Sequence, residues 1–207
     1  QETVVIDADG KRTEFPKGKW IELIQLLKNE VLDEPEIIKG KWQFTPLGLS
    51  SLSDTTFSRI KIAEITGSYD LQIIFDVYDG KEGLAVSLPV GSTSVTLVVD
   101  GWNPPKTYLS HVNGKSPLKI REAVEGKIVH EGRNTYEISV RNFNEDQAII
   151  TVGANGTLLF QWKGSTEELS EDPSWTMPTK QSLGVGTNCS KMSVASVKLK
   201  LHAQQGQ

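Results

Sequence analysis

Cysteine is nearly absent from the sequence: Cys189 is the single one among 207 residues. One thiol cannot form an internal disulfide, and it excludes zinc and iron–sulfur sites that several cysteines ligate. Apolar residues flank it between Leu183 and Val194. We therefore expect Cys189 to be a small buried side chain of the hydrophobic core.

Long apolar runs and an excess of positive charge are also missing. No apolar stretch approaches the ~18 residues that a membrane-spanning helix requires. The formal net charge is -4, whereas a general nucleic-acid-binding domain carries a basic face. We therefore expect neither a nucleic-acid partner nor a membrane span.

The motifs of several enzyme classes are absent as well. The sequence has no G-x-S-x-G elbow, no H-E-x-x-H zinc motif and no phosphate-binding P-loop. Gly184-Val185-Gly186 lacks the third glycine of a dinucleotide-binding fingerprint. The E-x-D-x-x-E strand of sandwich glucanases is missing too, because Asp70, Asp76 and Asp79 have the wrong spacing. No local pattern therefore indicates a hydrolase.

Short extended segments dominate what the sequence does contain. Between residues 69 and 78, Leu71, Ile73 and Phe75 share one face, at the two-residue period of a half-buried strand. Further strands are expected at 84–90, 95–100, 136–140, 148–152, 157–162 and 197–201, with a bulge near Ala195-Ser196. About a dozen such strands, with turn signals roughly every 8–12 residues, predict an all-β sandwich or barrel.

One segment has the spacing of a helix. Apolar residues recur at intervals of three and four from Trp20 to Leu27, and Asn29 marks the end of the pattern. We expect the apolar stripe of this helix, Trp20 included, to pack against the strands.

The sequence divides into a main domain and two terminal segments. Asp9-Gly10 lies between two short runs and predicts a hairpin. We therefore divide the chain into a hairpin-and-helix extension packed on the sandwich (1–41), the sandwich domain (42–201) and a flexible tail (202–207). Because the chain begins at Gln1 without a charged and apolar leader, we expect an exported protein, periplasmic or extracellular, whose signal peptide has been removed.

The tryptophans divide between strands and loops. Trp42 and Trp162 lie beside apolar strand residues and are expected in the core. Trp102 follows Asp100 and Gly101 in a loop rich in proline. Trp175 lies in another loop, where it forms either a lid over a groove or a staple on the edge of the sandwich.

The loop around Trp102 gathers aromatic faces, amides and an imidazole in a short stretch. Sugars bind to such sets, because their C–H faces stack on Trp or Tyr rings and their hydroxyls pair with Asn, Asp or His. The alternative is that Trp102 anchors a long loop to the core. The candidate ligand-binding residues are Trp102, Asn103, Tyr108, His111, Asn113 and Trp175.

A catalytic role would require a general acid or base, for which His111 and Asp76 are the candidates. The three histidines are scattered along the sequence and indicate no metal site. Asp7 and Asp9 resemble the start of a calcium loop, but Gly18 stands where that loop needs its closing glutamate. The residues themselves therefore indicate no metal and no cofactor.

Five segments carry a resemblance to a known family: Gly40-Lys41-Trp42, Ser68-Tyr69-Asp70-Leu71, 83–91, 98–102 and 183–186. The sequence resembles the concanavalin A-like lectin and glucanase sandwiches, and within them the 3-keto-disaccharide hydrolase domain common in planctomycetes. The resemblance covers about residues 19–201. It implies two antiparallel sheets in jelly-roll order, with carbohydrate on the concave face or its rim loops. Related sandwiches often hold a structural calcium ion, but neither a ligand set for one nor a catalytic set maps onto this chain.

Three functions are compatible with these observations. The first is carbohydrate recognition by an accessory or non-catalytic sandwich whose partner is a glycan or oligosaccharide. The second is a glycoside hydrolase or lyase that acts on 3-keto-disaccharides or related glycans. The third is a structural sandwich that interacts with other proteins and has no sugar site.

The first hypothesis makes a testable prediction at Trp102. If its ring is the stacking platform, Trp102→Ala abolishes glycan binding in a titration while the far-ultraviolet spectrum and melting temperature stay unchanged. Persistent binding by this variant would assign the site elsewhere.

Overall fold

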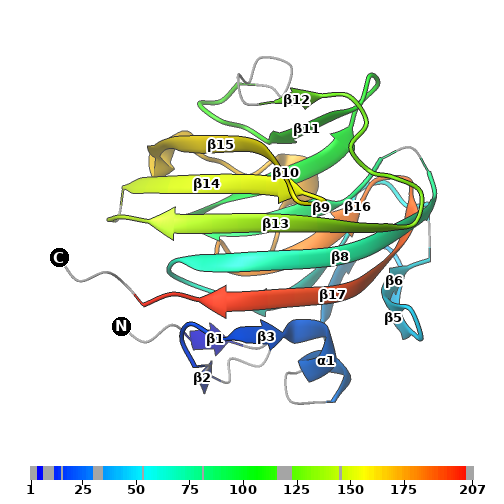
Figure 1. Ribbon diagram of the computed structural model, residues 1–207, viewed down its shortest axis with the longest axis horizontal. Helices are drawn as coiled ribbons and strands as arrows, with labels where there is room; N and C mark the ends of the chain where they lie inside the picture. Colours follow the sequence, from blue (N-terminus) through cyan, green and yellow to red (C-terminus); the bar gives the residue numbers. More distant parts are fainter. Residues whose placement is uncertain are drawn as a thin grey trace.

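Two antiparallel sheets stacked face to face form a β-sandwich, as the sequence predicts (Figure 1). The computed structural model describes residues 4–6, 12–14, 16–29, 35–52, 54–80, 82–115, 123–144 and 146–203. Within these residues the single α-helix is short, so extended chain builds almost all of the regular structure. The all-β fold class with one short N-terminal helix is therefore confirmed.

Sheet A holds nine strands and lies behind in Figure 1. In spatial order they are β12 (Val124–Glu125), β11 (Lys106–Leu109), β10 (Thr93–Gly101), β9 (Ala85–Val90), β16 (Ser182–Thr187), β7 (Ser58–Glu64), β1 (Val4–Ile6) and β2 (Arg12–Glu14), with β4 (Glu36–Lys39) also paired to β7.

Sheet B holds eight strands and faces the viewer in Figure 1. In spatial order they are β15 (Thr157–Ser165), β14 (Gln147–Ala154), β13 (Arg133–Asn142), β8 (Tyr69–Asp79), β17 (Lys191–Leu201), β6 (Gly48–Ser51) and β5 (Trp42–Thr45), with β3 (Trp20–Glu22) also paired to β17.

The core lies between the sheets and follows the predicted alternation. On β8, Leu71, Ile73 and Phe75 are buried, whereas the residues between them are only half-buried on the outer face. The phenol of Tyr69 lies wholly inside the sandwich and donates a 3.0 Å hydrogen bond to the backbone carbonyl of Pro89 on the opposite sheet. Burial raises the pKa of Tyr69 well above its ordinary value, so the phenol stays neutral.

The predicted bulge is confirmed on β17. The pairing of β17 with β8 shifts register between Val194 and Ser196, so one extra residue enters β17. Met192 and Val194 before the bulge are buried, as are the apolar residues after it. The bulge therefore keeps both halves of the strand in phase with the core.

The predicted helix begins later than its apolar pattern. Helix α1 spans Leu23–Lys28 and ends at Asn29, as expected, but Trp20 lies in β3, which pairs with β17. The side chain of Glu22 caps the helix by accepting a hydrogen bond from the amide of Ile24. The expectation that Trp20 packs inside is wrong, because pairing in β3 leaves this residue 51% exposed on the outer face.

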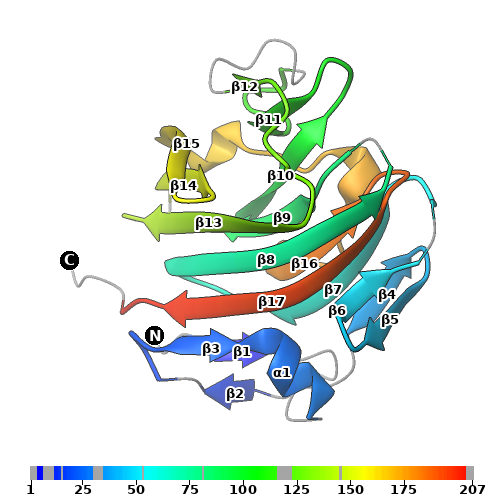
Figure 2. The same ribbon diagram turned by 45° about the vertical axis from the view of Figure 1, so that its right-hand side comes forward.

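Residues of the N-terminal segment contribute strands to both sheets. β1 pairs with β2 in a hairpin, as Asp9-Gly10 predicts, although the turn itself lies outside the described residues. β1 also pairs with β7 of sheet A. Figure 2 shows β3 and α1 beside β17 of sheet B. Strands β1 and β2 therefore belong to sheet A, and β3 belongs to sheet B.

Two further expectations concern the C-terminal part. His202, placed at the start of a flexible tail, donates its amide to the carbonyl of Ser68 at 2.9 Å, while residues 204–207 lie outside the described residues. Cys189 is exposed and not in the core. It lies in the turn between β16 and β17 with φ of 52°, where the side chain leaves the sheet.

Trp42 and Trp162 are buried, as predicted. No helix in the described part of the chain is long and apolar enough to cross a membrane.

Neighbouring isoleucines on β8 test the alternation directly. Ile73 is fully buried, and Ile73→Ala is expected to lower the free energy of unfolding by about 2–5 kcal/mol, since it leaves a cavity in the core. Ile74→Ala, one residue along on the outer face, is the matched control and should cost much less. Equal losses in urea unfolding would contradict the assignment of the two faces.

Candidate functional site

A groove of about 420 Å³ crosses the outer face of sheet B. It is lined by Trp20, 70–72, 137–139, Thr151, Gly153 and 156–158. These residues come from β3, β8, β13, β14, β15 and the turn between the last two strands. Because they share one face of one sheet, strand pairing holds the lining in place.

The floor of the groove consists of two adjacent rows of paired residues. In one row Asp70 lies opposite Ser139, which lies opposite Thr151. In the next row Gln72 lies opposite Glu137, which lies opposite Gly153. Residues directly opposite on adjacent strands have Cβ atoms about 5 Å apart, so these polar side chains stand close together.

Two exposed apolar side chains flank this polar floor. Trp20 lies at one side, and the ammonium group of Lys200 lies 6.0 Å from the centre of its ring. Leu158 lies at the other side and is 66% exposed. Large apolar side chains left open beside a concavity indicate a binding surface.

Three polar side chains of the floor are free to bind. Within the part of the chain that the structure describes, no side-chain hydrogen bond or ion pair involves Gln72, Glu137 or Ser139. Together they offer an amide, a carboxylate and a hydroxyl, and thus both donors and acceptors.

Asp70 differs from these residues because it is already paired. Its carboxylate accepts a hydrogen bond from the Arg141 guanidinium, and its other oxygen lies 2.8 Å from Nε2 of His202. Burial raises the pKa of Asp70, but the hydrogen bonds and charges of Arg141 and His202 outweigh burial and leave that pKa below its ordinary value. Asp70 is therefore a fixed negative charge at the edge of the groove.

The structure brings together part of the site predicted in the Trp102 loop. Trp102 and Asn103 are exposed, and the indole Nε1 of Trp102 donates a 2.7 Å hydrogen bond to the hydroxyl of Tyr108. Tyr108 itself is buried, and burial raises its pKa. Trp102 thus presents a free ring, whereas Tyr108 supports it from below and has no exposed face.

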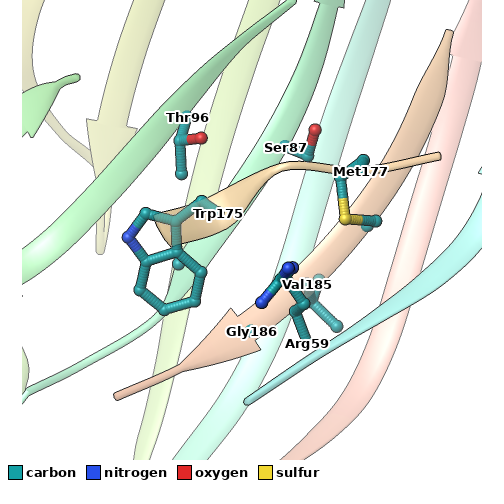
Figure 3. Close-up of a pocket in the computed structure, with 9 residues that line it drawn as sticks. Arg59, Ser87, Thr96, Trp175, Met177, Val185 and Gly186 are labelled. Atoms are coloured by element: carbon teal, nitrogen blue, oxygen red, sulfur yellow. The ribbon is translucent and has the colours of Figure 1, made fainter. Parts of the chain in front are cut away.

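Trp175 belongs to a segment, Thr166 to Gln181, that we call the strap. It crosses the outer face of sheet A, where Trp175 and Met177 lie over β16 (Figure 3). A Cβ at Gly186 would come within 2.7 Å of the Trp175 ring, and one at Gly184 within 2.3 Å of Met177. Trp175 is buried and packs edge-on against Phe57, so it anchors the strap.

The strap leaves little room on sheet A. The cavity beneath it is about 10 Å³, lined by residues that include Ser87 and Thr96. Glu171 of the strap accepts a hydrogen bond from Ser94, and the guanidinium of Arg59 donates to the backbone carbonyl of Thr176. The strap therefore covers the outer face of sheet A around β16, whereas the groove on the outer face of sheet B is open.

The remaining predicted residues lie apart from the groove. His111 Nε2 is 3.7 Å from a carboxylate oxygen of Asp172, and the amide of Asn113 donates to Glu168 at 3.3 Å. Asp76 lies farther along β8, 3.6 Å from the Arg133 guanidinium. His111, in the loop after β11, and Asp76, on β8, thus have separate neighbours and do not form an acid–base pair.

Among the described residues, no group of three or more His, Cys, Asp or Glu side chains is placed to hold a metal ion.

Sequence reasoning missed the groove for a specific reason. The alternation in β8 marks Gln72 as outward-facing, but only the pairing of β8 with β13 and β14 places Glu137 and Thr151 next to it. The one local signal was Trp20, which the helical spacing assigned to the core.

Comparison with known proteins supports the fold. No family model and no curated protein matches the chain. Among solved structures, the carbohydrate binding module CBM66 from Bacillus subtilis is 13% identical, with 88% of this chain and 96% of that one covered and a TM-score of 0.50. A Crh5 transglycosylase in complex with NAG is 10% identical, with 90% and 84% covered and a TM-score of 0.54. Identities this low show a shared sandwich fold alone.

The paired Asp70 yields a prediction about pH. The pKa of Asp70 is lowered in the folded protein. As pH falls, this carboxyl group therefore takes up a proton in the unfolded chain, near its ordinary pKa of 3.8, at a higher pH than in the folded protein. The stabilisation from Asp70 is therefore complete above about pH 5 and is lost as pH falls through the lower folded pKa. Asp70→Asn should lower the melting temperature by a few degrees at neutral pH and converge with the wild type in acid.

Asp76→Asn on the same strand is the matched control. Its partner Arg133 is mostly exposed, so water screens this pair and the variant should change the melting temperature less. A melting temperature of Asp70→Asn that runs parallel to the wild type from neutral pH down to about pH 2 would contradict the assignment.

Proposed function

We propose that the protein recognises carbohydrate through the groove on sheet B and does not act on it chemically. One observation carries the proposal: Gln72, Glu137 and Ser139 stand unpaired between the exposed Trp20 and Leu158. A sugar ring has apolar C–H faces and a rim of hydroxyls. The groove offers the matching surfaces, an indole at the side and hydrogen-bonding groups on the floor.

The volume of the groove is compatible with a small ligand such as a sugar. At about 420 Å³ it falls in the range of small-molecule sites, roughly 300–1,000 Å³. Gly153 has no side chain, so a ligand can approach the backbone of β14 there. The carbohydrate-binding module and the transglycosylase found by comparison support the class of ligand through fold alone.

The rival site is the exposed Trp102 with Asn103, predicted from the sequence. Its ring is available, but Tyr108 takes up its N–H, and His111 and Asn113 contact strap residues. The Trp102 loop therefore offers fewer free polar groups than the groove.

Catalysis has weaker support than binding. The groove contains two carboxylates, Asp70 and Glu137, at a diagonal position on neighbouring strands. Glycosidases use two carboxyl groups, one of which must donate a proton. Asp70 is held ionised by Arg141 and His202, which leaves Glu137 as the single candidate acid. Sugar release from 3-keto-disaccharides or other glycans by the purified protein would overturn the non-catalytic proposal.

Two tryptophans separate the rival sites. After a glycan array has identified a ligand, Trp20→Ala should weaken its binding about tenfold or more in calorimetric titration, which corresponds to roughly 1.4 kcal/mol or more. Trp102→Ala, which removes an equally exposed indole elsewhere, is the matched control and should bind like the wild type.

If Trp102→Ala alone loses binding, the sugar site lies in the Trp102 loop and not in the groove. Failure of the wild-type protein to bind any sugar on the array would contradict carbohydrate recognition and favour a protein-interaction role.

A further inference from the structure

A second cleft of about 440 Å³ opens on the outer face of sheet B. It is lined by 45–47, 50–52, Tyr78 and 191–193, from β5, β6, β8 and β17. Tyr78, Leu47 and Leu52 are about half exposed there. None of the residues that line this second cleft was predicted from the sequence as a site residue, and none of them lines the groove.

Strand β8 connects the groove to the cleft. Gln72 lines the groove and Tyr78 lines the cleft, and both point outward because they are separated by an even number of residues. Six residues of extended strand span about 20 Å. That distance exceeds one sugar unit and matches several units in an extended chain.

Small or partly buried side chains make up β8 and β17 between the two depressions. On β8 these are Ile74 and Asp76, which are half-buried, and on β17 Ser196, which is buried. Thr135 of β13 lies opposite Ile74 and is also half-buried. No large exposed side chain stands on β8 or β17 between Gln72 and Tyr78. The guanidinium of Arg133 on β13 lies 3.6 Å from Asp76, so a ligand that lies along β8 would contact this ion pair.

The floor of the cleft consists of hydroxyl groups that are bonded to one another, whereas the polar side chains on the floor of the groove are unpaired. The hydroxyls of Ser50 and Ser193 are hydrogen bonded to each other, and Thr45 bonds Ser50 at 2.9 Å. Ser50 and Ser193 are buried, so this row is fixed beneath the opening. Tyr78 provides an exposed aromatic ring beside it. An aromatic face next to fixed hydroxyls suits a sugar unit.

We infer that the ligand is an extended oligosaccharide chain, of which one part lies in the groove beside Trp20 and another in the cleft beside Tyr78. This inference rests on the proposed function and adds its ligand class: a linear glycan bound along its length. A chain that occupies both sites gains contacts with each added unit, whereas a monosaccharide or disaccharide reaches only one of them.

The test is a length series measured by calorimetry. Chito-oligosaccharides, laminari-oligosaccharides and cello-oligosaccharides from disaccharide to hexasaccharide are titrated into the full chain. For the series that binds, affinity should rise about tenfold or more between the disaccharide and the hexasaccharide. Tyr78→Ala should remove that rise and leave disaccharide binding unchanged, and Phe143→Ala, an exposed ring elsewhere, should leave both unchanged.

The outcomes separate this inference from the proposed function. Disaccharide binding that depends on Trp20, with no gain from longer chains or no effect of Tyr78→Ala, overturns the extended ligand and leaves sugar recognition standing. Binding that depends on neither Trp20 nor Tyr78 overturns both the extended ligand and the proposed function. An absence of binding across all three series and the array does the same.

Discussion

The strict alternation of side chains along β8 is the constraint on which the rest of the molecule depends. This strand pairs with β13 on one side and β17 on the other, at the centre of sheet B. Its inward residues, such as Ile73 and Phe75, build the core. Its outward residues, such as Gln72 and Tyr78, line the two depressions. A shift of one residue in register would bury the polar set and expose the apolar one, so fold and candidate site share one requirement.

Much of the fold could be read from the sequence because a period of two is a local property. The faces of β8, the bulge near Ser196 and the burial of Trp162 all follow from neighbours in the chain. The predictions for Trp20 and Cys189 are wrong because they took apolar character alone as a sign of burial, and both residues are exposed. Cross-strand pairing placed Trp20 on the outer face, and the left-handed turn turned Cys189 to solvent.

The candidate site was harder to predict because its members are distant in sequence. Trp20, Gln72 and Glu137 meet through pairings of β3, β8, β13 and β17, and no local motif records such pairings. The sequence predicts a site in the Trp102 loop because its candidate residues lie close together between Trp102 and Asn113. Its tyrosine proved to be a buried support, and Trp175 proved to be an anchor.

The outer face of sheet A carries the strap whereas that of sheet B does not, and Gly184 and Gly186 explain this difference. Their missing side chains leave a shallow strip on β16 into which Met177 and Trp175 of the same chain fit. The strap thus fills this strip on sheet A. Removal of the strap would therefore expose a flat strip on β16, while the outer face of sheet B would keep its present surface.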